Sequence, residues 1–454
     1  MAELAWDTFG EESIAHFKAL LRIPTINPPG NEKPAAEYIA QVLSAEGIPF
    51  TLVEAAPGRT SLVARLVADR PDGRGPLLLN GHLDVVPVDP EHWTHDPFGA
   101  VEADGCIWGR GAIDMKNMVT MSLMTLIGLK RAGVQLGRDV ILATVADEEA
   151  GSHNGAVYLV EKHPELVRAE YVLNEVGGHT LHIGPKHRTT RYYPVQVAEK
   201  GICWFELTAE GEPGHGSMPH PGNAVVTLAR AVERLGTVAL PQHAVPVVAE
   251  FLKTIAKGAP FPRSLMIPML LQPTLAGQIL KIMQRVDPEQ RKGINAMLRN
   301  TTSPTMLAAG SKVNVIPSRA TATIDGRILP GQTLEGFLAE VRTVIGEGLG
   351  IRVIDHHDGT TFNRETPLYT AITAALGRHD PEGVPVPYMI PGFTDSFAYG
   401  RLGATCYGFS PVRLEPGMSF TKMYHGHNER IPRAGYLWGQ RVLYELVRDF
   451  SAAH

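Results

Sequence analysis

A histidine and two aspartates between positions 80 and 115 have the residue types and spacing of a metal site. His82 and Asp84 follow an apolar, strand-like run at 77–79, and Asp114 lies in a glycine-rich turn before a helical stretch. Because residues i and i+2 of a strand point the same way, Asp84 can fix the tautomer of a metal-binding His82. The alternatives are a metal-free histidine–aspartate hydrogen bond and, for Asp114, a helix N-cap. These residues alone leave both interpretations open.

The adjacent carboxylates Glu148 and Glu149 follow another apolar run, at 140–145. Neighbouring carboxylates repel each other unless cations or protons compensate their charge. Since neighbours in extended chain point in different directions, one can bind metal while the other activates water as a general base. The alternative is a solvent-exposed acidic loop, which Asp147 beside the pair favours. Polar residues just past buried strands are nonetheless where open α/β sheets keep their chemistry.

Two further candidate ligands lie outside this stretch. Glu175 closes the apolar run 171–173, and His425 lies far along the chain in the segment 424–429. Together the candidates are two histidines and three carboxylates, a mixed nitrogen and oxygen set that suits zinc, and also manganese or cobalt. If Asp114 bridges, five ligands are enough for two metal ions that polarise a carbonyl and activate water.

The composition of the chain limits its class. A length of 454 residues is too great for one core, which predicts two or more domains. A net charge of −5 gives no support for a nucleic-acid partner. Three widely spaced cysteines fit a reducing cytosol better than a disulfide framework. No signal peptide or membrane-spanning run is evident, so we expect a cytoplasmic protein with a small-molecule substrate and no membrane partner.

The expected elements describe a large domain interrupted by a smaller one. Over residues 1–198 strands alternate with helices at 11–21, 37–46 and 116–132, which predicts a mostly parallel central sheet. A β-α-β-β-α-β order over 199–362 predicts an inserted α+β domain, with a helical insertion at about 240–305. The expected strands there are 203–209, 313–316, 320–328 and 351–355, and the expected helices are 224–235 and 334–346. Residues 363–454 return to the first domain.

Five motifs follow one another along nearly the whole chain: HLDVVP at 82–87, WGRGAIDMK at 108–116, DEEAG at 147–151, GHGS at 214–217 and NVIP at 314–317. With these motifs the chain resembles the aminoacylase / carboxypeptidase G / succinyl-diaminopimelate desuccinylase / acetylornithine deacetylase family of dinuclear metallopeptidases. The resemblance implies an α/β, zinc-peptidase-like catalytic domain and an inserted ferredoxin-like lid and dimerisation domain. It also implies a homodimer and two divalent metal ions, zinc first, with cobalt or manganese as alternatives.

The resemblance further implies a role for each candidate in the first domain. Asp84 orients a ligand histidine, and Glu148 acts as general base and then as the acid that protonates the leaving amine. The final metal ligand is His425 and not His427, because it lies three residues before an Asn-Glu pair. The implied ligands are His82 and Glu175 for one metal, Glu149 and His425 for the other, and Asp114 as the bridge.

In the lid domain the resemblance implies an oxyanion donor and a carboxylate clamp. His215 corresponds to a histidine that reaches the partner subunit's site in dimeric relatives and stabilises the oxyanion. Asn314 and Arg327 match positions that hold the substrate carboxylate, for which the planar fork of arginine is suited. Gly392 matches a loop that also contacts this carboxylate. That loop here reads Gly-Phe-Thr-Asp, where the family more often has Gly-Gly-Thr-Asp.

The implied function is a dinuclear metal-dependent hydrolase that cleaves an amide bond next to a free carboxylate, in N-acyl amino acids or short peptides. The alternative is a catalytically inactive binding protein on the same fold. The apolar residues at 265–271 suggest a further hypothesis, that the helical insertion lines the entrance for a hydrophobic acyl or side chain. Packing of these residues on the lid helices is the other interpretation.

Overall fold

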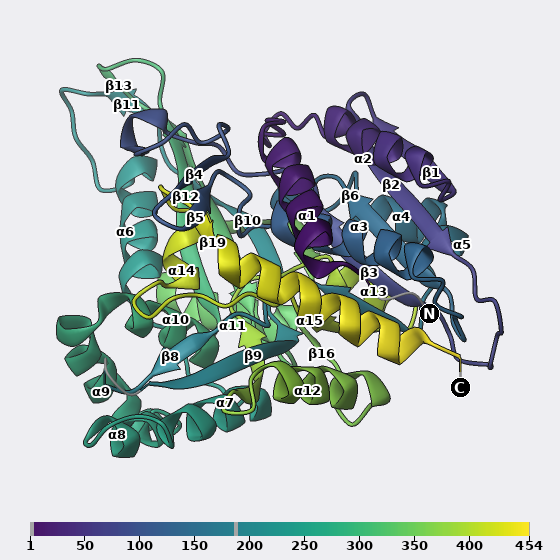
Figure 1. Cartoon of the computed structure of the whole chain (residues 1–454). Coiled ribbons are helices and arrows are strands. Elements are labelled where there is room, and N and C mark those ends of the chain that lie inside the picture. The colour runs from purple at the N-terminus through teal and green to yellow at the C-terminus, as the bar shows by residue number, and fades with distance from the viewer. Residues whose placement is uncertain (1–3, 186–188, 454) are drawn as a thin grey trace. The chain divides into compact units, whose positions relative to one another are not determined.

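The computed structural model describes residues 4–185 and 189–453, which form two compact units. Unit 1 consists of residues up to 197 together with 362–387 and 394 onwards, and unit 2 consists of residues 198–361 and 388–393. Figure 1 traces the chain from purple to yellow. Among the described residues, no helix has the length and apolar character to cross a bilayer.

A twisted, mostly parallel sheet forms the centre of unit 1, with the strand order β1-β2-β6-β3-β7-β18-β9. The four middle strands run parallel, and β1, β2 and β9 add antiparallel edges. All residues of β3, β6 and β7 are buried, which accounts for their unbroken apolar runs. The expected α/β fold class with a mostly parallel central sheet is therefore confirmed. The strands are β1 (Phe50–Ala56), β2 (Arg59–Leu66), β3 (Leu77–His82), β6 (Val140–Val145), β7 (Tyr171–Asn174), β9 (Thr190–Glu199) and β18 (Thr405–Gly408).

Helices from opposite ends of the chain pack together in unit 1. α3 (Lys116–Arg131) is buried on all sides from its first residue to Leu129, as expected for a helix without a polar face. It contacts both α1 (Trp6–Leu21) and α15 (Arg433–Ser451), which lie alongside each other in Figure 1. Further elements of this unit are α2 (Lys33–Ala45), β4 (Val101–Ala103), β5 (Cys106–Trp108), α4 (Ala156–Lys162), α5 (Pro164–Val167), β8 (Leu181–Ile183), α12 (Pro367–His379), α13 (Ser396–Gly400), α14 (Phe420–Met423), β19 (Arg430–Pro432), and two short 3-10 turns at Pro90–His92 and Glu148–Ala150.

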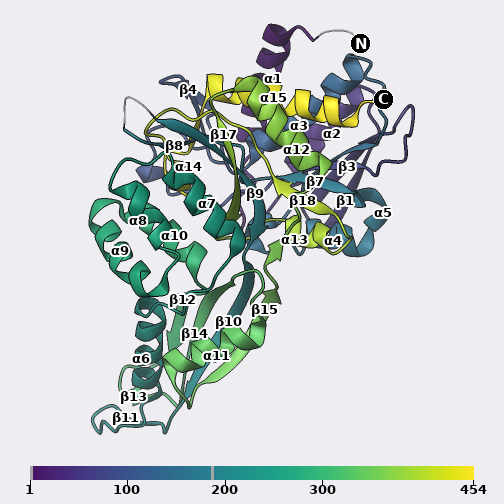
Figure 2. The same ribbon diagram turned by 90° about the horizontal axis from the view of Figure 1, so that it is seen from below.

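Unit 2 contains an antiparallel sheet in the order β12-β14-β10-β15. Side chains of β10 and β14 alternate between buried and half-buried, because one face of the sheet packs against α6 and α11. Figure 2 shows α11 lying across this sheet. The elements are β10 (Gly201–Glu210), α6 (Ala224–Thr237), β12 (Thr301–Ala309), β14 (Arg319–Ile328), α11 (Leu334–Ile345), β15 (Gly350–His357) and β16 (Thr360–Thr361), with β17 (Val384–Ile390) reaching into this unit.

The strand expected at 313–316 is wrong as a member of this sheet. Only β13 (Val315–Ile316) is extended there, and it pairs with β11 (Gly214–His215) in a separate two-stranded ribbon. The fourth sheet strand is instead β12, whose first residues were expected in the helical insertion. β12 carries Pro304 beside an irregularity in register, and proline is confined to edge strands, where its missing N–H faces outward. Because of this proline and the exposure of the strand, the sequence lacks the apolar alternation from which a strand is predicted.

A helical insertion precedes β12 and consists of α7 (Pro246–Ala256), α8 (Arg263–Met269), α9 (Pro273–Val286) and α10 (Pro288–Leu298). Proline lies in the first turn of α7, α9 and α10, where its fixed φ suits a helix start and its missing N–H costs nothing. No residue of α8 is buried.

Candidate metal centre and substrate clamp

Three parallel strand ends in unit 1 bring the candidate metal ligands together. β3 ends at His82 and pairs in parallel with β6 on one side and β7 on the other. Glu148 and Glu149 follow β6, and Glu175 follows β7 directly. Because these strands run in one direction, all of these side chains lie at the same edge of the sheet.

Two groups of side chains converge at this edge, and they share Asp114. In the first, Nε2 of His82 lies 3.0 Å from Oδ1 of Asp114 and 3.8 Å from Oε2 of Glu175. In the second, Nε2 of His425 lies 3.2 Å from Oδ2 of Asp114 and 3.0 Å from Oε2 of Glu149. Within each group the donor atoms lie within 4.8 Å of one another, so each could hold a metal ion. His427 belongs to neither group, and its ring packs on that of His92.

Burial disfavours the charged forms of the carboxylates of this centre, and bound cations would stabilise these charged forms. Burial raises the pKa of Glu175 to about 7, and burial followed by the charge of Asp114 raises the pKa of Glu149. Oε1 of Glu149 is buried and has no hydrogen-bond partner. A buried, unpartnered carboxylate oxygen beside histidine nitrogens fits a divalent cation, which is the donor chemistry that zinc prefers.

Hydrogen bonds with the surrounding carboxylates favour the protonated forms of the two histidines. Burial alone would lower the pKa of His82, but hydrogen bonds with Asp114, Asp84 and Glu175 raise it well above its usual range. The same balance raises the pKa of His425 to about 11. Metal binding would displace these protons, because a ligating histidine is neutral.

Asp84 connects His82 to the pair of glutamates. Nδ1 of His82 lies 2.9 Å from the backbone oxygen of Asp84 and 3.4 Å from its Oδ1. The carboxylate of Asp84 accepts hydrogen bonds from Nδ2 of Asn27 at 2.8 Å and from the backbone N–H groups of Glu148 and Glu149, both at 3.2 Å. One aspartate thus fixes a candidate ligand and the turn that carries the candidate base.

Glu148 is buried in a 3-10 turn and not in a solvent-exposed loop. Its neighbour Asp147 is buried as well and accepts hydrogen bonds from Arg59 at 2.7 Å and from Asn154. Burial and the charge of Glu175 raise the pKa of Glu148 well above its usual range. A carboxylate with a raised pKa beside a candidate metal centre is suited to take and return a proton.

Glu429 is a residue whose role the sequence analysis missed. Its buried carboxylate accepts backbone hydrogen bonds from Ile113 at 2.6 Å, Asp114 at 3.0 Å and Gly111 at 3.1 Å, and a side-chain bond from Arg110 at 2.7 Å. It thereby ties the loop of Asp114 to the segment that carries His425. The sequence did contain a signal, because the Asn-Glu pair was used to place His425. The pair was not used to assign a role to Glu429 itself.

Asp395 is a second buried carboxylate near the centre. It accepts hydrogen bonds from Ser152 at 2.6 Å and Asn80 at 2.9 Å, and burial raises its pKa to about 6. These bonds join the loop after Glu149 to β3 and to the Gly-Phe-Thr-Asp loop.

In unit 2 the candidate clamp is built around Arg327. Its Nε and Nη2 donate to the two carboxylate oxygens of Asp325, at 2.7 and 2.9 Å. The guanidinium lies over the ring of Phe393, 5.3 Å from its centre. The phenylalanine that departs from the common loop sequence therefore supports the arginine. The backbone oxygen of Gly392 accepts a bond from the N–H of Lys200 at 3.0 Å.

Lys200 is the second residue that the sequence analysis missed. The side chain is fully buried and donates to Oγ1 of Thr301 at 3.1 Å. Burial, and then the charge of Arg327, lower its pKa to about 7. A buried ammonium beside a guanidinium is costly unless an anion joins them. A lone lysine has no spacing signature, so only the structure reveals this pair.

His215 and Asn314 lie together on the exposed β11–β13 ribbon of unit 2. His215 pairs with Val315, and the N–H of Gly216 donates to the backbone oxygen of Asn314 at 2.9 Å. Nδ1 of His215 lies 2.7 Å from Oγ of Ser217, and both His215 and Asn314 are exposed.

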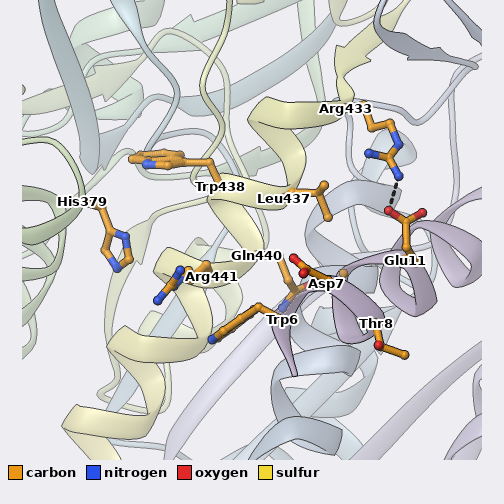
Figure 3. Close-up of a pocket in the computed structure, with 11 residues that line it drawn as sticks. Trp6, Asp7, Thr8, Glu11, His379, Arg433, Leu437, Trp438, Gln440 and Arg441 are labelled. Carbon is orange, nitrogen blue, oxygen red and sulfur yellow. Dashed lines mark hydrogen bonds and ion pairs between the residues drawn. The ribbon is translucent and has the colours of Figure 1, made fainter. Parts of the chain in front are cut away.

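A separate cavity of about 830 Å³ lies between α1 and α15 in unit 1 (Figure 3). Among the side chains that line it, Arg433 pairs with Glu11, and His379 pairs with Glu445 at 2.9 Å. None of the candidate site residues is among the residues that line it, and we assign it no function.

Residues 78–449 match the sequence profile of peptidase family M20/M25/M40. The chain belongs to this family. This M20 protein is 33% identical over 365 residues to N-fatty-acyl-amino acid synthase/hydrolase PM20D1 of Xenopus tropicalis, a match that covers 79% of this chain and 69% of that protein. It is 26% identical over 457 residues to aminoacylase-1 of Sus scrofa, covering 97% and 95%.

The fold of this M20 protein is also that of the metallo-carboxypeptidase Sso-CP2 from Sulfolobus solfataricus. The TM-score is 0.72 at 19% identity, over 97% of this chain and 99% of that one. Family membership makes the chain a metallohydrolase that acts on amide bonds, as expected from its motifs. The alternative of an inactive binding protein gains no support.

Proposed function

We propose that this M20 metallohydrolase releases an amino acid from an N-acyl amino acid. The observation that carries the proposal is the pair of ligand groups that share Asp114 beside the buried Glu148. The acyl-amino-acid class is supported by the names of two relatives, an N-fatty-acyl-amino acid synthase/hydrolase and an aminoacylase. Dipeptides are the alternative substrate class.

In this proposal His82 and Glu175 hold one divalent ion, Glu149 and His425 hold a second, and Asp114 serves both. Zinc suits this donor set, with cobalt or manganese as alternatives. When bound, such ions polarise the substrate carbonyl and make water more acidic.

Glu148 moves the protons of the reaction. Its carboxylate takes a proton from the attacking water and then delivers it to the nitrogen of the leaving amino acid. The raised pKa favours both steps, because it makes the carboxylate a stronger base and keeps the proton available for return. Asp84 holds the backbone N–H of Glu148 and also lies against His82, so the base and the ligand are positioned by one side chain.

The substrate carboxylate binds to unit 2 through Arg327 and the Gly392 loop, and Lys200 adds a second cation. Asn314 lies with His215 on the β11–β13 ribbon, at the opposite end of β14 from Arg327, so it would contact this carboxylate only in the partner subunit's site, as proposed below for His215. Arg327 uses Nε and Nη2 on Asp325, and within the described residues its Nη1 makes no hydrogen bond. A substrate carboxylate at this point would compensate the buried Lys200 and the partly buried Arg327.

We further propose that residues 199–362 act as a lid and dimerisation domain between the catalytic segments 1–198 and 363–454. His215, exposed on its ribbon, would then act in the partner subunit's site as an oxyanion donor. Three free, buried cysteines support a reducing, cytoplasmic location.

The test compares wild type with Glu148→Gln. The variant should retain two equivalents of zinc by elemental analysis and lose about 10²–10⁴-fold in kcat on N-acyl amino acids. Glu161→Gln, at an exposed site of the same unit, is the matched control and should keep full activity. Activity retained in Glu148→Gln would contradict the assigned base. Wild-type hydrolysis of dipeptides alone would contradict the substrate class.

A further inference from the structure

The helical insertion of unit 2 carries a charge opposite to that of the rest of the chain. Between residues 251 and 286 there is no aspartate or glutamate, and there are five cations. The chain as a whole has a net charge of −5, so the remainder carries −5 − 5 = −10. The five cations are Lys253, Lys257, Arg263, Lys281 and Arg285.

Within the part of the chain that the structure describes, these cations have no anionic partner. Among the described residues, none of the five forms an ion pair or a side-chain hydrogen bond, and all five are exposed. Most other arginines of the chain are paired, for example Arg131 with Glu12 and Glu46. The positive charge of the insertion is therefore free to meet an external anion.

Large apolar side chains are exposed among these cations. Phe261 is 83% exposed, Leu265 62%, Ile282 52% and Val286 62%. Ile282 and Val286 lie four residues apart within α9, so they occupy successive turns on one face. Leu265 lies in α8, and Phe261 lies in the turn before this helix. The turn that carries Phe261 continues into α8, because the N–H of Ser264 donates to Pro260 and that of Leu265 to Pro262.

The exposed pair of α9 adjoins the face of this helix that is buried in unit 2. Ala276, Ile279 and Leu280 are buried, and Ile282 and Val286 follow Ile279 by three and seven residues, so they continue its stripe while each is more than half exposed. Lys281 and Arg285 each precede one member of the exposed pair in sequence. An exposed apolar stripe with adjacent cations is the pattern of helices that bind at a lipid–water interface.

We propose that the α8–α9 surface, formed by Phe261, Leu265, Ile282, Val286 and the neighbouring cations, binds an anionic lipid surface. The apolar side chains enter the acyl boundary while the cations reach the headgroups, and each cation near such a surface strengthens binding about fivefold. A second copy of the chain fits less well, because a two-fold contact would place the five cations against themselves. The contact is peripheral, and this proposal differs from the expectation of no membrane partner drawn from the sequence.

This inference stands apart from the proposed function, since it concerns binding and not turnover. If both hold, an acyl chain long enough to partition into lipid would meet the enzyme at the same surface.

The test is co-sedimentation of the full-length, zinc-loaded enzyme with vesicles of phosphatidylcholine, alone or mixed with phosphatidylserine. We expect binding to the mixed vesicles at low salt and its loss at high salt. Lys281→Glu with Arg285→Glu should weaken binding by about tenfold or more, and so should Ile282→Ser with Val286→Ser. Matched controls are Lys162→Glu and Val67→Ser, at exposed sites of unit 1, which should bind as wild type.

The proposal is overturned if wild type does not bind the mixed vesicles. It is also overturned if the substituted variants bind them as well as wild type does. If sedimentation velocity shows that the same substitutions dissociate a dimer without affecting vesicle binding, the surface is an interface between copies. All variants should hydrolyse a short-chain substrate at the wild-type rate, which shows that they fold. If no N-acyl amino acid is hydrolysed even by wild type, the proposed function fails while the vesicle result still decides this inference.

Discussion

Glu429→Gln tests whether one buried carboxylate holds the centre together. The change leaves an acceptor oxygen for Ile113 and Asp114 but places an NH2 group where Gly111 and Arg110 now donate. Donors would then face donors, and the buried guanidinium would lose its counter-charge. Removing one partner of a buried ion pair costs about 3–5 kcal/mol. Burial raises the pKa of Glu429, while the charge of Arg110 and the backbone donors oppose this rise.

The cost should lie near the lower end of that range, about 3 kcal/mol, because Arg110 keeps two other contacts. Its Nη2 donates to the backbone oxygen of Gly426 at 3.0 Å, and its guanidinium lies over Trp93. The loosened loop should also weaken zinc binding about 10–100-fold, as loss of a group that orients ligands typically does.

Urea denaturation of the metal-free protein measures the first effect, and competition with a chelator measures the second. Glu12→Gln is the matched control, because it removes a carboxylate from Arg131 at a pair that is about one-third exposed. It should cost less than about 1 kcal/mol and leave zinc affinity unchanged. If Glu429→Gln unfolds within about 1 kcal/mol of wild type and binds zinc equally well, Glu429 does not organise the centre.

Four further outcomes follow from the same structure. Lys200→Met should raise KM for an N-acyl amino acid about tenfold or more and leave KM for the corresponding amide unchanged. Lys200→Arg should have an intermediate effect on KM. Equal effects on both substrates would exclude a contact between Lys200 and the substrate carboxylate. If the helical insertion receives the acyl group, kcat/KM should be at least tenfold higher for long-chain than for acetyl derivatives of one amino acid, and equal values would rule that out. Dialysis against a chelator should abolish hydrolysis and zinc should restore it, whereas activity that survives complete metal removal would contradict the metal centre. Burial lowers the pKa of His179 to about 4, because the folded state disfavours the charged imidazolium. The contribution of His179 to the free energy of unfolding is therefore fully present above pH 6.5, and it is lost as the pH falls from 6.5 toward 4. The difference in unfolding free energy between wild type and His179→Asn should therefore shrink by about 3 kcal/mol over that range, and a pH-independent difference would show that His179 titrates normally.

Features with a local pattern could be predicted from the sequence. The unbroken apolar runs of β3, β6 and β7 predict buried parallel strands, because both faces of each strand are covered. The residues just past those strands then identify an edge of the sheet where chemistry is expected. In unit 2, by contrast, β12 carries a proline and is largely exposed, so no apolar alternation marks it.

Features that depend on tertiary contact could not be predicted. Glu429 and Lys200 each stand next to an oppositely charged residue, Arg430 and Glu199, and nothing in these neighbours reveals that both are buried or what they bind. Phe393 looks like a departure from a motif until the structure places it under Arg327. The acidic segment at Asp147 resembles a solvated loop, because its partner Arg59 lies 88 residues away. Burial of charge depends on long-range partners, which local spacing does not encode.

The sharing of Asp114 between both ligand groups has a consequence for the biosynthesis of the protein. His425 is added 311 residues after Asp114, which at about 5–20 residues per second corresponds to roughly 15–60 s of translation. From the addition of Glu175 until the end of that interval, a nascent chain contains His82, Asp114 and Glu175 but lacks the segment that completes the second group and carries Glu429. The growing chain would therefore expose acidic and imidazole side chains without a finished centre. Capture of the full metal complement would then be among the last events in its maturation, and premature termination anywhere before residue 425 would yield a chain without the second group of ligands.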